Sequence, residues 1–399
     1  MTEYKEIKCS SFINRMNESL FTIRTYSIRL TANPYSGCAH SCAWCYAQYI
    51  HKFNVRHDPD ITPKDFSKKI FVKVNAPEIL EKELQFFKKK NLPREYCDLS
   101  TITDSYQPCE AKYRITRRCL KLFLEYNFPV TILTRSNLIL DDLDIWKKLA
   151  QKKIGVVGLS ITRPTSLDAK IKQILEPASP STAKLLQTLK TLNDNGIPTF
   201  VFVNPIVPFM TDSQESLYQL FKEISQTGCK TVFFGVMKLN PLTWSLFKER
   251  IKTYDSTLIK NFEDLYIKMG EKEFNRSWQP SLAYRTKLYN TAKDICKELN
   301  IGFSCEGGMY DLWLNDWCDI ENPYRYPTGY NLWKILKNMH GSNVSFDELK
   351  NILLKDFPIL SAKYFYYLEK LWNEEELFED LKEIKSTKIG SLIKYAYDK

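Results

Sequence analysis

The sequence has no uninterrupted apolar run long enough to cross a lipid bilayer. Its first residues do not combine a basic start, an apolar stretch and a small-residue cleavage site, which is the pattern of a secretory signal. No unit repeats at a fixed period, and no segment is of low complexity. We therefore exclude a membrane-spanning protein and a repeat array, and we expect a cytoplasmic protein.

A disulfide framework is also excluded. The eleven cysteines are odd in number, and a reducing cytoplasm keeps thiols available for metal binding or catalysis. They are unevenly spread, because three of them fall within residues 38–45. This cluster is the first place to look for chemistry.

The length and charge set broad bounds. A chain of 399 residues that is 44% hydrophobic can bury a sizeable core, in one large domain with additions or in two domains. The net charge of +10 permits an anionic partner such as nucleic acid. Its local runs, such as Lys88 to Lys90 and Lys147-Lys148, fall in helical patterns and indicate solvated helix faces.

Short apolar runs alternate with amphipathic helical stretches through the middle of the chain. Strand, helix, strand with short connections predicts parallel strands joined by right-handed crossovers, either in a partial barrel or in a doubly wound sheet. In both folds, functional residues lie at the carboxyl ends of the strands. We expect strands at residues 26–30, 97–103, 130–134, 156–161, 199–203 and 231–236, with helices near 114–126, 143–152, 181–195 and 215–227.

The chain changes character near residue 242. The later sequence is helical in pattern and rich in Tyr, Trp and Lys, with little sign of strands. We expect an N-terminal extension over residues 1–25, a barrel over 26–242, and a helical C-terminal extension or cap over 243–399. The aromatic residues of the last region could stack nucleic-acid bases, but they fit the core of a helical cap better; they are Tyr310, Trp313, Trp317, Tyr324 and Tyr326.

The cysteine cluster lies in residues 33–47, NPYSGCAHSCAWCYA, directly after the first expected strand. Cys38, Cys42 and Cys45 are separated by three and then two residues. A loop with this spacing can bind three of the four irons of one [4Fe–4S] cubane, and the fourth iron then stays open to a substrate or cofactor. Structural metal sites usually close their coordination sphere, whereas reactive sites leave a position free.

A zinc site is the main alternative. Three cysteines with His40 or His51 would complete four zinc ligands, and the protein would then be a zinc-dependent nucleic-acid-binding protein without catalysis. Zinc motifs favour paired short spacings, and no second cysteine pair follows at a usual distance. A group of three unliganded cysteines is the remaining alternative.

With these residues in view, the chain resembles the radical S-adenosylmethionine (SAM) superfamily, and within it the spore photoproduct lyase-like branch. Besides the cysteine loop, the resemblance rests on residues 70–77 (IFVKVNAP), 103–110 (TDSYQPCE), 113–119 (YRITRRC) and 174–177 (ILEP). It implies a partial (β/α)6 barrel, a [4Fe–4S] cluster and S-adenosyl-L-methionine. It also implies reductive cleavage of SAM to a 5′-deoxyadenosyl radical, which abstracts hydrogen from a substrate.

The resemblance further implies partners. Members need a one-electron reductant such as flavodoxin or ferredoxin. Those of this branch are often labelled DNA repair photolyases, so the substrate is a nucleic acid lesion or another modified biomolecule.

Four residues match cofactor-binding positions of the family. Trp44 precedes the third cysteine and is expected near the adenine of SAM. Thr103, after the second strand, would contact its amino acid moiety. Arg135 closes the third strand where relatives commonly carry lysine, and it would pair the methionine carboxylate unless it forms a surface salt bridge. Ser160, near the end of the fourth strand, would bind the ribose or carboxylate unless it is only a small packed residue.

One departure from the family concerns the hydrogen donor. Spore photoproduct lyase carries a hydrogen-donating cysteine where this chain has Thr101. Cys97 would share a strand face with Thr101 but lie about a dozen ångströms deeper. Cys109 lies past the turn, where it could reach the mouth of the barrel or be buried. We therefore do not expect thymine-dimer reversal.

Three later cysteines leave a second metal site open. Cys296, Cys305 and Cys318 could bind a second cluster or metal, but their spacings match no established pattern. Isolated buried cysteines are the simpler interpretation.

Overall fold

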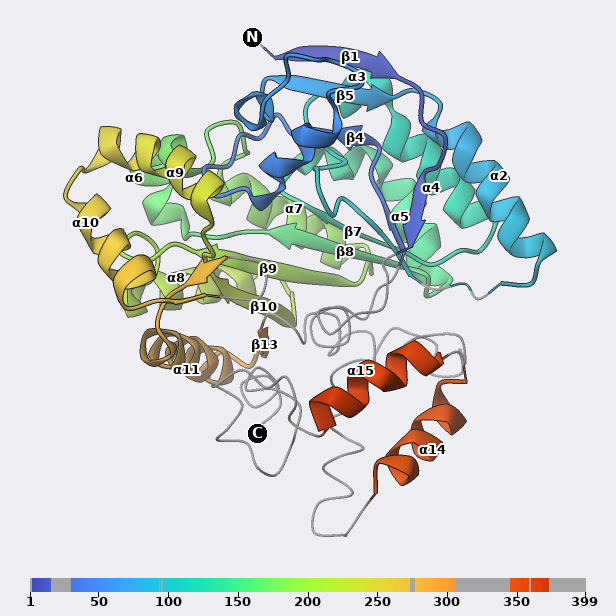
Figure 1. Cartoon of the computed structure of the whole chain (residues 1–399). Coiled ribbons are helices and arrows are strands. Elements are labelled where there is room, and N and C mark those ends of the chain that lie inside the picture. The colour runs from blue at the N-terminus through green and yellow to red at the C-terminus, as the bar shows by residue number, and fades with distance from the viewer. Residues whose placement is uncertain are drawn as a thin grey trace.

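The computed structural model describes residues 2–15, 30–92, 94, 96–272, 277–305, 345–358 and 360–372. In this part of the chain the largest sheet has eight strands in the order β13-β10-β9-β8-β7-β6-β3-β2 (Figure 1). All neighbours pair in parallel except β2, which is antiparallel to β3. The strands are β2 (Ile13–Arg15), β3 (Leu30–Ala32), β6 (Cys97–Leu99), β7 (Val130–Thr134), β8 (Gly155–Ser160), β9 (Thr199–Ile206), β10 (Thr231–Val236) and β13 (Gly302–Cys305).

Helices connect these strands and cover the sheet. All six residues of β8 are buried, as expected for a parallel strand covered on both faces. The four helices expected between strands are confirmed as α4, α5, α7 and α8, and the sheet and helices share one large hydrophobic core. The helices are α2 (Ala76–Lys89), α3 (Glu110–Tyr113), α4 (Ile115–Glu125), α5 (Leu143–Gln151), α6 (Thr165–Leu175), α7 (Thr182–Asp194) and α8 (Gln214–Ser225), with the 3₁₀ segments η1 (Tyr46–Phe53), η2 (Pro63–Asp65) and η3 (Asn137–Asp142).

A second, smaller sheet lies above the first in Figure 1. It has the order β1-β5-β4, with β1 (Glu3–Ile7) parallel to β5 (Lys69–Lys73) and β4 (Tyr35–Ser36) antiparallel to it. Residues 3–7 and 13–15, which we expected in an N-terminal extension, thus supply one strand to each sheet. This small sheet fixes the backbone that leads into the cysteine loop.

Two expected strands differ in the structure, and one strand was not expected. The strand expected over 97–103 ends at Leu99, because Ser100 has a φ of +95°, which turns the backbone out of the extended conformation. The first strand begins at Leu30, and residues 26–29 lie outside the described part of the chain. β13 was not expected at all. Its four residues carry no β-branched run, and it forms because β10 offers a parallel edge.

The chain beyond residue 242 is mostly helical where it is described, apart from β13. It contains α9 (Pro241–Tyr254), α10 (Leu258–Glu263), the π-helical turn η4 (Asp264–Lys268), α11 (Leu282–Glu298), α14 (Phe346–Asp356), α15 (Ala362–Trp372) and the short strands β11 (Glu271–Lys272) and β12 (Trp278–Gln279). No described helix is long and apolar enough to span a membrane. The five tail aromatics expected in a cap lie outside the described residues.

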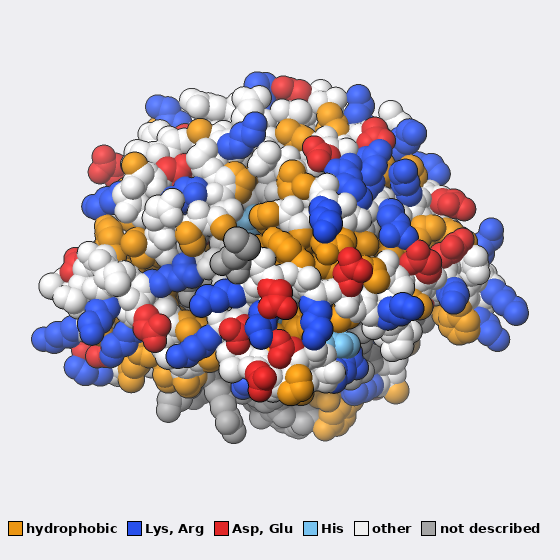
Figure 2. Space-filling view, turned by 90° about the horizontal axis from the view of Figure 1, so that it is seen from above, with side chains coloured by type: hydrophobic (Ala, Val, Ile, Leu, Met, Phe, Trp, Pro, Cys, Tyr) orange, Lys and Arg blue, Asp and Glu red, His pale blue; other side chains and the backbone are white. Residues whose placement is uncertain are grey.

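Charge is dispersed on the face that Figure 2 shows. Lysine and arginine side chains are spread there among acidic and neutral ones, and apolar side chains gather near the middle of the face. The two lysine runs expected on solvated helix faces, Lys88 to Lys90 and Lys147-Lys148, are exposed.

Candidate functional site

The three clustered cysteines lie on the loop that follows β4. Cys38, Cys42 and Cys45 are partly buried free thiols. Gly37 opens the loop with a φ of +92°, and a Cβ there would lie 2.8 Å from the carbonyl oxygen of Lys69 and 2.9 Å from that of Phe66. Only glycine lets the loop pack this closely on the segment before β5.

The loop after β6 braces the cysteine loop on one side. The Thr103 hydroxyl donates to the carbonyl of Gly37 at 2.6 Å. The Gln107 side chain donates to the same carbonyl at 3.2 Å and accepts from the backbone N–H of Ala39 at 2.9 Å. Thr103, expected to contact the cofactor, is thus placed against the carbonyl of Gly37, and Gln107 contacts the loop backbone on either side of Cys38. Gln107 was missed, although it lies in the TDSYQPCE segment that carried the family resemblance.

Asp104 ties the two loops to the end of β7. Its buried carboxylate accepts from the backbone N–H of Arg135 at 2.9 Å and the hydroxyl of Thr134 at 2.7 Å, and lies 3.2 Å from Nε2 of His40. Burial disfavours the carboxylate, but His40 and these hydrogen bonds outweigh it and hold the pKa of Asp104 below its ordinary value. Asp104 thus links His40 of the cysteine loop to the end of β7.

The end of α6 and Arg250 of α9 brace the cysteine loop on the other side. The backbone N–H of Ala43 donates to the carbonyl of Leu175 at 2.9 Å. Arg250 of α9 donates to the Ser41 hydroxyl at 2.7 Å and to the carbonyl of Ile174 at 3.4 Å. The cysteine loop is therefore fixed by contacts from three separate parts of the chain.

Arg135 lies at the carboxyl end of β7, where it was expected, but it is already paired. Its Nη1 donates to Oε1 of the buried Glu176, whose Oε2 accepts from Arg163 Nη1 at 2.5 Å. Burial would raise the pKa of Glu176, but Arg135 and Arg163 lower it to about 2. The pair is nearly buried, so the expected alternative of a surface salt bridge does not apply. Glu176 was missed, although the ILEP segment contained it.

Trp44 and Ser160 are also near this network. Trp44 is 7% exposed and packs in a hydrophobic cluster with Leu175, and the guanidinium of Arg135 lies 6.0 Å from its ring centroid. Ser160 is the last residue of β8 and is buried, and its hydroxyl makes no hydrogen bond to another described residue. Ser160 closes β8 as the sequence indicated, and the expected contacts of both residues with the cofactor stay predictions.

The chemistry of the thiols suits a multinuclear centre. Burial raises the pKa of all three thiols, that of Cys42 to about 12, while the positive charge of Arg135 acts in the opposite direction on Cys42 and Cys45. A metal must therefore displace protons to bind here. Among the described residues, no three His, Cys, Asp or Glu side chains are grouped for a single ion. Thiolates that bind separate irons of a cubane stand further apart than ligands of one ion, so the residues fit a cluster.

Comparison with known proteins agrees with this geometry. Residues 32–221 match the family model of the radical SAM superfamily. The chain contains a radical SAM domain. The matched residues run from the end of β3 into α8 and include all three loop cysteines. The superfamily implies SAM and an iron–sulfur cluster as cofactors, and it makes this protein an enzyme.

Curated proteins are similar to this chain over much of its length. A protein of Mycobacterium tuberculosis, named as uncharacterized, is 27% identical over 264 residues, which cover 66% of this chain and 73% of the relative. A protein of Methanocaldococcus jannaschii, also named as uncharacterized, is 32% identical over 180 residues, covering 45% of this chain and 61% of the relative. These likenesses carry no named reaction.

Solved structures show the same fold. A cysteine-to-serine variant of spore photoproduct lyase aligns with a TM-score of 0.57 and 12% identity over 76% of this chain and 81% of the lyase. Another variant of that lyase, with bound AdoMet and dinucleoside spore photoproduct, gives 0.55 and 13% over 73% and 80%. At this identity the likeness shows the fold alone, and it confirms the expected α/β radical SAM architecture.

The two histidines considered as zinc ligands contact other groups of the protein. Nε2 of His51 lies 3.0 Å from the carbonyl of Lys69, and its Nδ1 lies 3.2 Å from the Asn54 amide. His40 contacts Asp104 and, at 3.4 Å, the carbonyl of Ala178. Both ring nitrogens of His51 thus have hydrogen-bond partners, whereas Nε2 of His40 is buried beside Asp104 without a hydrogen bond to a residue that the structure describes. Among the described residues neither histidine is grouped with the cysteines for a single ion, which argues against the zinc alternative.

No thiol replaces the lyase's hydrogen donor at the position of Thr101. The Thr101 hydroxyl accepts from the Asn33 amide at 3.0 Å. Cys97 is fully buried on β6, and the turn at Ser100 breaks the shared strand face that we expected. Cys109 is 5% exposed, so burial, and not an open position at the mouth, is what the structure shows.

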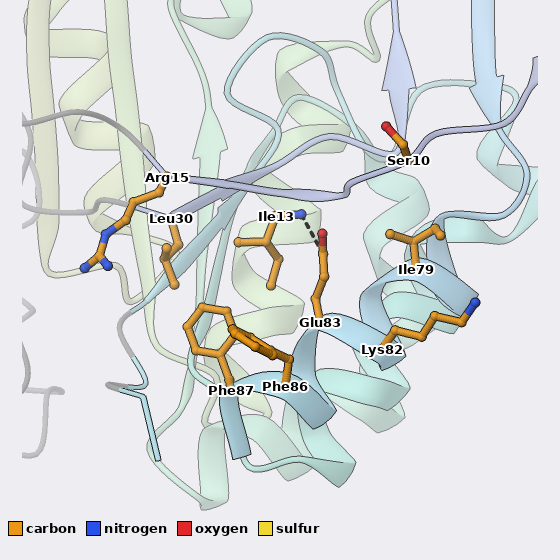
Figure 3. Close-up of a pocket in the computed structure, with 9 residues that line it drawn as sticks. All are labelled: Ser10, Ile13, Arg15, Leu30, Ile79, Lys82, Glu83, Phe86 and Phe87. Carbon is orange, nitrogen blue, oxygen red and sulfur yellow. Dashed lines mark hydrogen bonds between the residues drawn. The ribbon is translucent and has the colours of Figure 1, made fainter. Parts of the chain in front are cut away.

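The remaining expected and observed sites lie apart from the cysteine loop. Cys296 is buried in α11, Cys305 ends β13, and Cys318 lies outside the described residues, so isolated cysteines stay the simpler interpretation and a second metal site the alternative. A groove of about 360 Å³ lies between β2, the start of β3 and α2. Ile13, Leu30 and Phe86 are among the residues that line it (Figure 3). Leu30 is at the amino end of β3, so this groove is not part of the cysteine site.

Proposed function

We propose that this enzyme binds a [4Fe–4S] cluster through Cys38, Cys42 and Cys45 and uses it to cleave S-adenosylmethionine reductively. The observation that carries the proposal is the loop itself, in which three free thiols are held by buried polar groups on both sides. Three thiolates leave one iron of a cubane without a protein ligand. When reduced, such a cluster supplies the electron that splits SAM into methionine and a 5′-deoxyadenosyl radical, which takes a hydrogen atom from the substrate.

The residues around the loop have separate roles in this proposal. Arg135 pairs the methionine carboxylate through the N–H groups that Glu176 does not use. Ser160 offers a hydroxyl to the ribose or carboxylate, and Trp44 closes the site from its apolar side beside the adenine. Thr103 positions the loop backbone, and the direct contacts with the cofactor come from Arg135, Ser160 and Trp44.

Two partners follow from the chemistry. The protein needs a one-electron reductant, for which we propose a flavodoxin or ferredoxin. A flavodoxin or ferredoxin and the free thiols suit the reducing cytoplasm. The substrate approaches at the carboxyl ends of the strands, where the cysteine loop lies.

We propose a nucleic acid as the substrate class, on the evidence of η1. Directly after Cys45, this segment exposes three aromatic rings: Tyr46 at 58%, Tyr49 at 40% and Phe53 at 67%. The Tyr46 hydroxyl donates to the carbonyl of Thr101, which places the ring at the carboxyl end of β6. Exposed rings beside a reactive centre suit stacking with unpaired bases, and the exposed Lys52 supplies a charge for phosphate.

A direct test is the fate of SAM. We expect the reconstituted, dithionite-reduced protein to form methionine and 5′-deoxyadenosine in equal amounts without added substrate, slowly, as measured by chromatography. A Cys42→Ala variant should form neither product, while a Cys229→Ser variant, which changes a buried thiol far along the chain, should match the wild type. Zinc in place of iron, with no SAM cleavage, would support the zinc-dependent binding protein instead.

A further inference from the structure

A buried network of charged side chains lies beside the cysteine loop, with the Glu176 carboxylate at its centre. Glu176 is 1% exposed and accepts from two guanidinium groups, those of Arg135 and Arg163. It also accepts from the hydroxyls of Thr162 at 3.1 Å and Ser179 at 3.2 Å. Burying this much charge is costly unless the charges are paired, and both guanidinium groups here are paired with the Glu176 carboxylate.

Glu176 and its partner Arg163 are fixed by more contacts than a simple ion pair between Glu176 and Arg135 would require. Arg163 is itself buried and is fixed from its far side, since its Nε donates to Asp168 at 2.7 Å. The preceding residue, Leu175, accepts the backbone N–H of Ala43 in the cysteine loop at 2.9 Å. The carboxylate of Glu176 is therefore fixed in position relative to the cysteines.

Of the three guanidinium nitrogens of Arg135, only Nη1 makes a hydrogen bond to a residue that the structure describes. Its Nη1 is on Glu176, its backbone N–H is on Asp104 at 2.9 Å, and its guanidinium faces the Trp44 ring at 6.0 Å. Nε and Nη2 make no hydrogen bond to any other residue that the structure describes. A guanidinium binds a carboxylate bidentately through two parallel N–H groups, and this edge offers such a pair.

We propose that Glu176 is a positioning residue for the cofactor: fixed by Arg163, Thr162 and Ser179, it holds Nη1 of Arg135 so that the Nε–Nη2 edge stays set for the methionine carboxylate of SAM. This inference rests on the proposed function. Supporting partners of a ligand-binding group often matter nearly as much as the group itself, and their loss typically weakens the site 10–100-fold.

Glu176→Gln removes both the negative charge of Glu176 and its hold on Arg135. These two losses should change the affinity for SAM in opposite directions. Glu176→Gln leaves two cations without their shared anion, and electrostatics alone would then strengthen the hold of Arg135 on a carboxylate. Loss of the anchor would instead let the guanidinium turn away and weaken SAM binding. The direction of the change therefore separates a positioning role from a purely electrostatic one.

The test is a double-mutant cycle on SAM affinity, measured by calorimetry on the cluster-loaded protein. We expect Glu176→Gln to keep the iron content of the wild type and to weaken SAM binding roughly 10-fold. In an Arg135→Ala background the same change should have no further effect, because Glu176 acts through Arg135. Glu176→Asp, which keeps the charge, should fall between the wild type and the Gln variant. Asp144→Asn, which breaks an exposed carboxylate–arginine pair elsewhere, is the matched control and should bind SAM normally.

The outcomes distinguish this inference from the proposed function. Tighter or unchanged SAM binding in Glu176→Gln would overturn the positioning role, and so would effects of Glu176→Gln and Arg135→Ala that add in the double variant. The shift in the electron paramagnetic resonance spectrum of the reduced cluster on adding SAM gives an independent readout, and it should require about tenfold more SAM in Glu176→Gln. A wild-type protein that binds neither cluster nor SAM would instead refute the proposed function.

Discussion

Glu110 is a buried carboxyl group that the proposed cofactor chemistry does not use. It is 2% exposed, accepts from the hydroxyl of Tyr35 and from the backbone N–H of Arg117, and has Cys109 as its neighbour in sequence. Burial raises the pKa of Glu110 to about 7, although its hydrogen bonds act in the opposite direction. The folded protein therefore keeps a proton on Glu110 at pH values where the unfolded chain has lost it.

This makes Glu110 a source of pH-dependent stability. Between pH 4.5 and 7 the folded state binds more protons than the unfolded state, so the free energy of unfolding should fall as pH rises, by about 3 kcal/mol. Glu110→Gln removes this titration, and its free energy of unfolding relative to the wild type should rise by that amount from pH 5 to 8 in urea unfolding. A difference that does not change with pH would mean that Glu110 is ionised throughout.

The sequence located the reactive residues better than it described their contacts. The spacing of the cysteines and the strand-end positions of Arg135 and Ser160 placed these side chains at one end of the sheet. It could not show that Arg135 is paired with Glu176, because the two are brought together only by the packing of the loop after α6 on the end of β7. Thr103 was placed on the cofactor, yet its hydroxyl bonds the carbonyl of Gly37.

Among the elements, η1 links the reactive loop to the molecular surface. The rings of Tyr49 and Phe53 are in edge-to-face contact, with centroids 6.4 Å apart, and both are exposed. If unpaired bases stack on them, Phe53→Ala should weaken binding of a short single-stranded oligonucleotide by about 1 kcal/mol or more, measured by fluorescence anisotropy. Phe86→Ala, an equally simple change of an exposed ring on α2, is the control and should leave the affinity unaltered. Equal affinities for all three proteins would remove η1 from the substrate site.

The elements that the sequence predicted poorly are short or lie where the local pattern is interrupted. β13 has four residues with a glycine and a serine among them, so its strand character comes from pairing with β10 and not from propensity. The end of β6 depends on the left-handed backbone of Ser100, a non-glycine residue that gives no signal in sequence. The longer runs of β7 to β10 and the amphipathic helices between them were predictable because their patterns extend over whole elements.

At the scale of the whole molecule, the protein shares its fold with spore photoproduct lyase, but we do not expect it to catalyse the reaction of that lyase. We expect little or no repair of spore photoproduct, because the final hydrogen return needs a weak S–H bond and Thr101 offers an O–H bond held near Asn33. The assay supplies the dinucleotide photoproduct, SAM and reductant, and follows recovery of intact thymidines. Repair that appears only in Thr101→Cys would identify the missing thiol as the cause. Multiple-turnover repair by the wild type would overturn this interpretation of Thr101.

The central claim is that Cys38, Cys42 and Cys45 together hold one [4Fe–4S] cluster, and iron and sulfide analysis after anaerobic reconstitution tests it most directly. The wild type should contain about four irons and four sulfides per chain, since three thiolates on one loop suit a single cubane. Cys42→Ala should lose the cluster and its visible absorbance, and Cys229→Ser should keep both. A Cys42→Ala protein with its full iron and absorbance would contradict the account.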